Sequence, residues 1–140
     1  MQALMLVAES AALLPEFRQR LTQAFPAAPI SDRGQTGEFR IAFPNNERVY
    51  VEYYGASLQA IGWEEAEITC IQKVLPTTHH VYSLAYRGIE AAKKVVVQLA
   101  NSNRVMVDND CGTLLIGADF VRKVLNEPHW YWFDDLSPNA

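Results

Sequence analysis

The sequence predicts a single mixed α/β domain of the α+β class, in which helices pack against a largely antiparallel sheet. Apolar residues that alternate with polar ones predict strands, and apolar residues spaced three or four positions apart predict helices. These segments follow one another as strand, helix, strand, strand, helix, and the same order then occurs again. Two βαββα-like halves, about 1–76 and 77–140, are therefore expected to build one sheet, because neither half could bury its sheet face alone.

The first half begins with a strand and a helix. The run Ala3–Ala8 is continuously apolar, as in a strand that is covered on both faces. Pro15 fits the first turn of the helix that follows, although Ser10 would also serve as a cap one turn earlier. One stripe of this helix carries the apolar residues Phe17, Leu21, Ala24 and Phe25.

A loop and a hairpin are expected next. Pro26 and Pro29 end the helix and open a loop that runs to about Gly37. Apolar residues then recur at every second position in 38–43 and again in 49–53, on either side of a Pro-Asn-Asn turn, which predicts a hairpin.

The first half ends with a second helix, from Trp63 to Leu75, which Pro76 terminates. Its first turns hold three acidic residues, where the helix dipole favours negative charge: Glu64, Glu65 and Glu67.

The second half repeats the pattern. A strand is expected at 80–86, a helix at 89–100, a hairpin formed by 104–108 and 113–116, and a last helix at 118–126. In the first of these helices, three polar residues are expected to face solvent: Lys93, Lys94 and Gln98. The order of the strands in the sheet cannot be derived from these patterns.

Length, composition and net charge limit the kinds of partner that the chain is expected to bind. A chain of 140 residues with 49% apolar and 20% charged residues is typical of one globular domain. Its formal net charge of −4 gives no net attraction to nucleic acids or to anionic membranes. We therefore expect neither of them as a partner.

A cytoplasmic location is expected from the cysteines and from the apolar run near residue 3. Cys70 and Cys111 match neither a metal-ligand pair nor a redox motif, so both are expected to be reduced thiols. The run Ala3–Ala8 has no basic residue before it and is followed by Glu9, which is not the pattern of a signal peptide. It is also too short to cross a bilayer.

No motif predicts catalysis, a metal or a cofactor. The stretch 108–112 is similar to a calcium-binding loop, but Gly112 stands one position too early and apolar residues follow, so a β-turn explains it better. The adjacent His79 and His80 point to opposite faces of a strand and cannot chelate one ion together. The chain is therefore not expected to be an enzyme, and no catalytic residue is assigned.

Two groups of aromatic residues stand out. Tyr50, Tyr53 and Tyr54 lie on the second hairpin strand. The second group lies directly before Asp134 and Asp135 and comprises His129, Trp130, Tyr131, Trp132 and Phe133. This run is expected either to pack over the sheet, which is the favoured interpretation, or to stay exposed as an anchor for a partner.

Two segments of the second half, VYSLAYRG (81–88) and RVMVDNDCGTLLIGADFVRKVL (104–125), resemble small bacterial proteins of the toxin-immunity type. Such proteins are cytoplasmic single domains that bind and block one cognate toxin. The resemblance implies the same function here, but it supplies no set of binding residues.

The function expected first is therefore neutralisation of a cognate protein toxin by occlusion. Basic side chains of the toxin would meet acidic residues, and exposed aromatic residues would provide the anchor. The expected contacts are Glu64, Glu65, Glu67, Trp130, Tyr131, Trp132, Asp134 and Asp135. The alternative is a non-catalytic regulatory domain of ACT-like type that binds a small molecule in a concave apolar pocket between the halves. The oligomeric state stays open.

Overall fold

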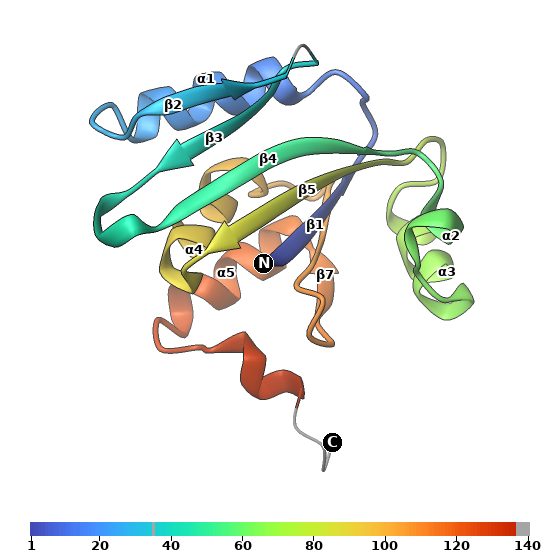
Figure 1. The fold of residues 1–140 in the computed structure, drawn as a ribbon. Helices are drawn as coiled ribbons and strands as arrows, with labels where there is room; N and C mark the ends of the chain where they lie inside the picture. Colours follow the sequence, from blue (N-terminus) through green and yellow to red (C-terminus); the bar gives the residue numbers. More distant parts are fainter. Residues whose placement is uncertain (35, 137–140) are drawn as a thin grey trace.

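The computed structural model of the chain describes residues 1–34 and 36–136. Seven strands form one antiparallel sheet in the order β2-β3-β4-β5-β1-β6-β7 (Figure 1). The strands are β1 (Gln2–Ala8), β2 (Ile30–Arg33), β3 (Glu38–Ala42), β4 (Arg48–Gly55), β5 (His80–Arg87), β6 (Met106–Asp108) and β7 (Leu114–Ile116). The helices are α1 (Leu14–Ala24), α2 (Leu58–Ile61), α3 (Glu65–Val74), α4 (Ile89–Leu99) and α5 (Gly117–Asn126), with 3-10 turns η1 (Pro44–Asn46) and η2 (Trp132–Leu136).

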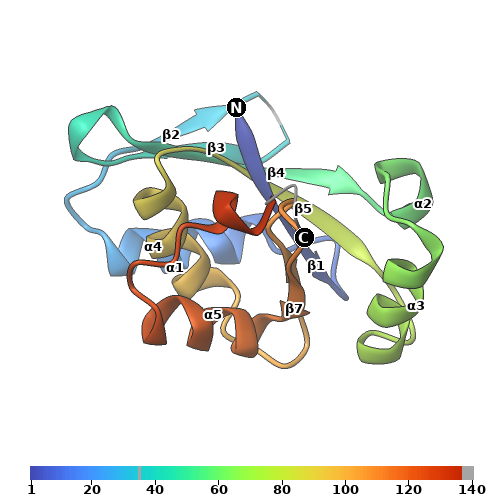
Figure 2. The same ribbon diagram turned by 90° about the horizontal axis from the view of Figure 1, so that it is seen from below.

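The two faces of the sheet are covered very differently. One face, here called the helix face, packs against α1, α4 and α5, whereas α2 and α3 lie together at one end of the sheet (Figure 2). The main core fills the helix face with side chains that include Leu6, Phe17, Phe39, Leu84 and Phe120. A smaller core lies on the opposite face beneath α2 and α3 and includes Val7, Trp63, Ile71, Val81 and Met106. The opposite face, here called the open face, is thus covered by helices at one end.

The strands of the two halves interleave. β5, from the second half, pairs with both β4 and β1 of the first half, and β1 pairs in turn with β6. All six pairings are antiparallel. The fold class predicted from the sequence, an α+β domain with an antiparallel sheet, is therefore confirmed.

The repeated βαββα order is correct for the second half and wrong for the first. Residues Ile30–Arg33, expected in a loop, form the edge strand β2, and a short helix α2 precedes α3. In β2 only Ile30 is partly buried, and the three residues after it are polar and exposed. The sequence of this edge strand therefore lacks the alternation of apolar and polar residues that predicts a strand. The predicted helix starts at Glu65 and not at Trp63, whose side chain is buried in the smaller core.

The C-terminal aromatic run packs into the main core. Trp132 is fully buried, and its indole Nε1 donates a hydrogen bond of 2.8 Å to the hydroxyl of Tyr86. Trp130 is also buried, with its ring centroid 5.4 Å from that of Trp132. These two residues are therefore not the exposed anchors that occlusion required; of the three predicted anchors, Tyr131 alone is exposed, at 49%.

The position of Lys93 also differs from the sequence prediction. It was expected to face solvent, but only 6% of it is exposed. Its Nζ donates to the carbonyl of Pro128 at 3.2 Å and to Glu90 at 3.4 Å. The long aliphatic stem is buried between α4 and the segment after α5 while the ammonium group keeps polar partners.

The burial of Trp132 predicts a large loss of stability on truncation. Trp132→Ala is expected to lower the free energy of unfolding by about 3–5 kcal/mol, because it leaves a cavity in the main core. The matched control Tyr131→Ala, which loses one ring contact with Phe133, should cost at most about 1 kcal/mol. Urea unfolding of both variants measures the difference. Similar losses would show that the segment does not pack as described.

Candidate functional site

The open face over β2 to β5 carries mostly polar side chains. Because successive residues of a strand point to opposite faces, the residues between the core positions Val49 and Val51 of β4, or Phe39 and Ile41 of β3, project from the open face. The same alternation applies to β2 and β5. The side chains gathered in this way are Arg33, Glu38, Arg40, Arg48, Tyr50, Glu52, Ala85 and Arg87.

The eight arginines of the chain divide into two groups by their partners. Four form ion pairs with carboxylates: Arg18, Arg20, Arg104 and Arg122. Within residues 1–34 and 36–136, no carboxylate lies at ion-pair distance from the other four, Arg33, Arg40, Arg48 and Arg87. All four of these arginines lie on the open face. They are four of the six Lys and Arg side chains that have no carboxylate partner among the described residues; the other two are Lys73 of α3 and Lys94 of α4.

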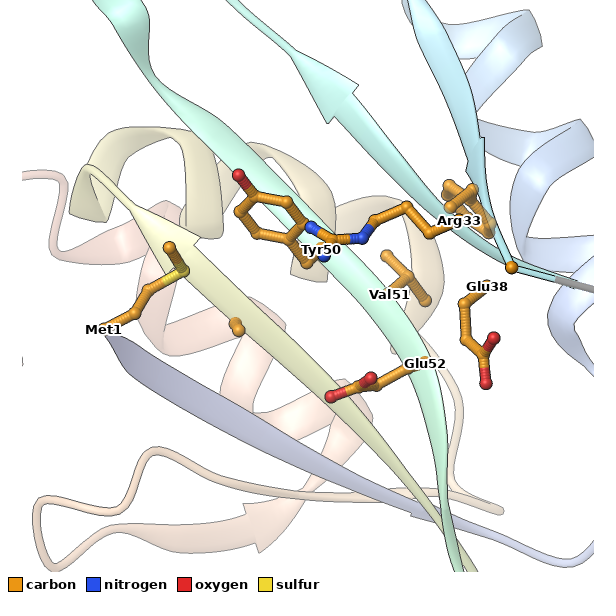
Figure 3. Close-up of a pocket in the computed structure, with 9 residues that line it drawn as sticks. Met1, Arg33, Glu38, Tyr50, Val51 and Glu52 are labelled. Carbon is orange, nitrogen blue, oxygen red and sulfur yellow. The ribbon is translucent and has the colours of Figure 1, made fainter. Parts of the chain in front are cut away.

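Tyr50 stands at the centre of this group. The guanidinium carbon of Arg33 lies over its ring, 4.5 Å from the centroid (Figure 3). Arg40 is directly opposite Tyr50 in the pairing of β3 with β4, and Arg48 precedes it by two residues on the same strand face. Hydrogen bonding by Arg48, with a smaller contribution from Arg40, lowers the pKa of the Tyr50 hydroxyl. The phenol thus lies in a positive local field.

Arg48 and Arg87 are directly opposite each other in the pairing of β4 with β5. Like charges at such positions destabilise a sheet. Arg48 also donates a hydrogen bond to the side chain of Asn46, which is uncharged. No carboxylate of the described residues forms an ion pair with either guanidinium group, although the carboxylate of Glu47 lies beside Gly88, the residue after Arg87.

A hollow of about 590 Å³ lies beside these residues and falls within the size range of ligand pockets. Its lining includes Met1, Arg33, Glu38, Tyr50, Glu52 and Ala85 (Figure 3). Figure 3 shows the Arg33 guanidinium beside the Tyr50 ring, with the carboxylates of Glu38 and Glu52 lying apart from this pair. The hollow therefore presents a cationic, aromatic side and an acidic side.

The acidic residues predicted as contacts fall into two separate groups. Glu64 and Glu65 are exposed at the start of α3, and Glu67 Oε1 accepts a hydrogen bond of 3.0 Å from the Glu64 backbone N–H as part of a capping box. Asp134 and Asp135 are exposed in η2, where Asp135 accepts a hydrogen bond of 3.0 Å from Thr113 Oγ1. No ion pair or hydrogen bond of the described chain joins the two groups.

A second, smaller hollow of about 200 Å³ lies between the halves. Its lining comes from β1, from the α2–α3 segment and from the end of β6: Met5, Ile61, Gly62, Trp63, Glu67, Asp108 and Asp110. Trp63 Nε1 donates to Asp108 Oδ2 at 2.6 Å, and the Asp110 N–H donates to Asp108 Oδ1 at 2.8 Å. Burial raises the pKa of Asp108, and the negative charges of Glu67 and Asp110 raise it further.

The stretch 108–112 lies at the connection between β6 and β7, which form the hairpin that the sequence predicted, and the Asn109 N–H donates a hydrogen bond of 3.1 Å to the Thr113 carbonyl across the loop. Asp110 and Gly112 have positive φ values of 58° and 102°, and Asn109 Oδ1 accepts hydrogen bonds from the N–H groups of Cys111 and Thr113. Across residues 1–34 and 36–136, no group of three or more His, Cys, Asp or Glu side chains is arranged to hold a metal ion.

Sequence reasoning did not identify the arginines of the open face. The period-two pattern places Arg40, Arg48 and Tyr50 on the polar side of a hairpin, and Tyr50 was noted as part of an aromatic group. The approach of Arg33 and Arg87 to these residues depends on an unpredicted strand and on the pairing of β4 with β5. No local signal in the sequence gives either.

The raised pKa of Asp108 predicts a pH dependence of stability. The folded chain holds this proton at a higher pH than the unfolded chain, whose aspartates titrate near about 3.9. The contribution of Asp108 to the free energy of unfolding should therefore fall as pH rises from about 3.9 through the folded pKa. Asp108→Asn should remove this part of the profile in urea unfolding, whereas the exposed control Asp134→Asn should keep it. Parallel profiles for wild type and Asp108→Asn would contradict the burial of this carboxyl.

Comparison of the chain with protein-family models, with curated protein sequences and with solved structures gives no match. The similarity of 81–88 and 104–125 to immunity-type proteins therefore remains an expectation. Among the described residues, no helix is long and apolar enough to span a membrane. The case for a function rests on the geometry of the open face.

Proposed function

We propose that this chain is a protein-binding protein of the immunity type, which neutralises a cognate toxin by covering it with the open face of its sheet. The observation that carries the proposal is the gathering of four arginines without carboxylate partners around Tyr50, on the part of the open face over β2 to β5 that α2 and α3 do not cover. Arginine and tyrosine are enriched among the residues that dominate binding energy at protein interfaces.

The charge pattern favours a protein over a nucleic acid. Binding of a nucleic acid takes much of its affinity from many contacts between basic side chains and phosphates, and acidic residues on the same surface oppose it. Here Glu38 and Glu52 lie on the same face as the arginines, and the chain has a net charge of −4. A partner with carboxylates opposite the arginines and a polar or basic edge opposite Glu38 and Glu52 fits this pattern.

The open face replaces the acidic residues as the proposed contact surface. Two of the three aromatic anchors expected beside those acids are buried, and the acids themselves are divided between α3 and η2. On the open face, by contrast, the binding side chains start from hydrogen-bonded strands. A rigid backbone of this kind loses little conformational entropy on binding, which favours affinity.

The experiment uses the natural partner. The purified chain would be immobilised to recover bound protein from the cells that make it, and the recovered protein would be purified and titrated against wild type and two variants. Tyr50→Ala and Arg40→Gln should each raise Kd about tenfold or more, which corresponds to about 1.4 kcal/mol. Arg20→Gln, which removes an arginine of α1 outside the open face, should change Kd less than about twofold.

The function itself is then tested with the same proteins. The wild-type chain should abolish the activity of the recovered protein at equimolar concentration, and Tyr50→Ala should require a higher concentration. Binding that is unaffected by both open-face variants, or a bound protein whose activity is unchanged, would overturn the proposal.

The hollow between the halves favours a second candidate function, a regulatory domain that binds a small molecule. It lies between the halves, where the ACT-like interpretation places a ligand, but three of its seven lining residues are acidic, whereas that interpretation predicted an apolar pocket. With Glu67, Asp108 and Asp110 around it, the suitable ligand class is a small organic cation.

A thermal-shift screen of small cationic metabolites tests this candidate. A ligand at one hundred times its Kd should stabilise the chain by about 2.7 kcal/mol. Trp63→Phe, which removes the hydrogen bond to Asp108, should weaken the shift. The absence of any stabilising compound, or an equal shift in Trp63→Phe, would argue against this site.

A further inference from the structure

We infer that Arg40, Arg48 and Arg87, together with the hydroxyl of Tyr50, form an oxyanion site on the open face that takes a single carboxylate or phosphate group. As the contact for an acidic side chain of the partner, the site rests on the proposed function. As a site for a small anion, it rests on the geometry of the sheet alone.

The register of three neighbouring strands brings these side chains together. Arg48 of β4 is opposite Arg87 of β5, and Tyr50, the next residue of β4 on this face, is opposite Arg40 of β3. Directly opposite residues have Cβ atoms about 4.5–5.5 Å apart, and diagonal ones lie about 7–8 Å apart. Arg40 and Arg87 are farther apart, because β4 lies between their strands and neighbouring strands are about 4.8 Å apart. An anion held above β4 lies between all three long side chains, which would reach it from both sides.

The charges of the group favour binding of an anion. No carboxylate of the described residues pairs with any of the three arginines, and two of them face each other across the strand pair. A bound oxyanion would convert this repulsion into charge-assisted hydrogen bonds, which are about twice as strong as neutral ones. The lowered pKa of Tyr50, caused by Arg48 and Arg40, agrees with a positive field at the same point.

The geometry of guanidinium groups defines the class of anion. Their planar fork matches carboxylates and phosphates with two parallel N–H bonds, and Tyr50 supplies one more O–H donor. Arg33 is stacked over the Tyr50 ring and flanks the site. Glu38 and Glu52 line the adjoining hollow and repel a second negative group, which limits the site to one oxyanion and excludes an extended polyphosphate.

The test is a side-chain NMR titration of the whole chain. Inorganic phosphate and, separately, acetate would be added at constant ionic strength while the Nε–Hε signals of the eight arginines are followed. Saturable shifts are expected at Arg40, Arg48 and Arg87, with the two anions reporting which oxyanion binds more tightly. Arg20 and Arg122, which lie in ion pairs on helices, should not follow the same curve.

Arg48→Gln is the decisive variant, with Arg20→Gln as its matched control. Arg48→Gln should weaken binding of the preferred anion about tenfold or more, whereas Arg20→Gln should leave it within about twofold. Loss of folding does not explain this result, because removing Arg48 relieves its repulsion with Arg87, and urea unfolding should show a stability at least equal to that of wild type. Shifts that are linear and alike at all eight arginines, or an unchanged affinity in Arg48→Gln, would overturn the site.

The outcome also separates this inference from the proposed function. If phosphate or acetate binds as described but no protein partner depends on the open face, the oxyanion site stands and the proposed function fails. If a partner binds through Tyr50 but neither phosphate nor acetate gives saturable shifts at Arg40, Arg48 and Arg87, the proposed function stands and the oxyanion site fails.

Discussion

The antiparallel pairing of β1 with β5 is the constraint on which both faces of the sheet depend. It joins the two halves of the chain over seven residue pairs, with Leu4 opposite Leu84 on the helix face and Met5 opposite Ser83 on the open face. A slip of one residue would exchange the two faces. Because β4 pairs with β5 in the same register, with Val51 opposite Leu84, the alternation continues outward to the hairpin. The position of the arginines is therefore set by the central core.

The two faces of the sheet are covered unequally because three helices pack on one face and two lie at one end of the other. α1, α4 and α5 present apolar stripes to one face and bury most of its strands. The opposite face has the short α2 and α3, which cover Val7, Val81 and Met106 at one end. The strands from β2 to β5 extend past this cover, so the side chains of the open face there meet solvent. An antiparallel sheet tolerates one solvated face, and this sheet fills it with arginine, glutamate and tyrosine.

Much of the fold is readable from the sequence, whereas the site is not. Strong periodicity located β1, β5, α4, α5 and the hairpin of β3 and β4 to within a few residues. Edge strand β2 was missed because Ser31, Asp32 and Arg33 carry no apolar alternation. Lys93 was misplaced because a charged residue on a helix normally faces water, and its burial depends on the Pro128 carbonyl. Likewise, Arg48 and Arg87 are 39 positions apart, and only the strand order makes them neighbours.

The main core and the open face have opposite effects on the stability of the chain. Trp132, Trp130 and Tyr86 bury large aromatic surfaces in the main core, which stabilises the fold. The open face contributes repulsion instead, since Arg48 is opposite Arg87 and no carboxylate of the described residues forms an ion pair with either. Because the core on the helix face stabilises the fold, the open face can keep side chains that favour binding at a cost in stability. Arginines held on a rigid sheet without ion-paired carboxylates are the reason why we propose an acidic partner for this surface.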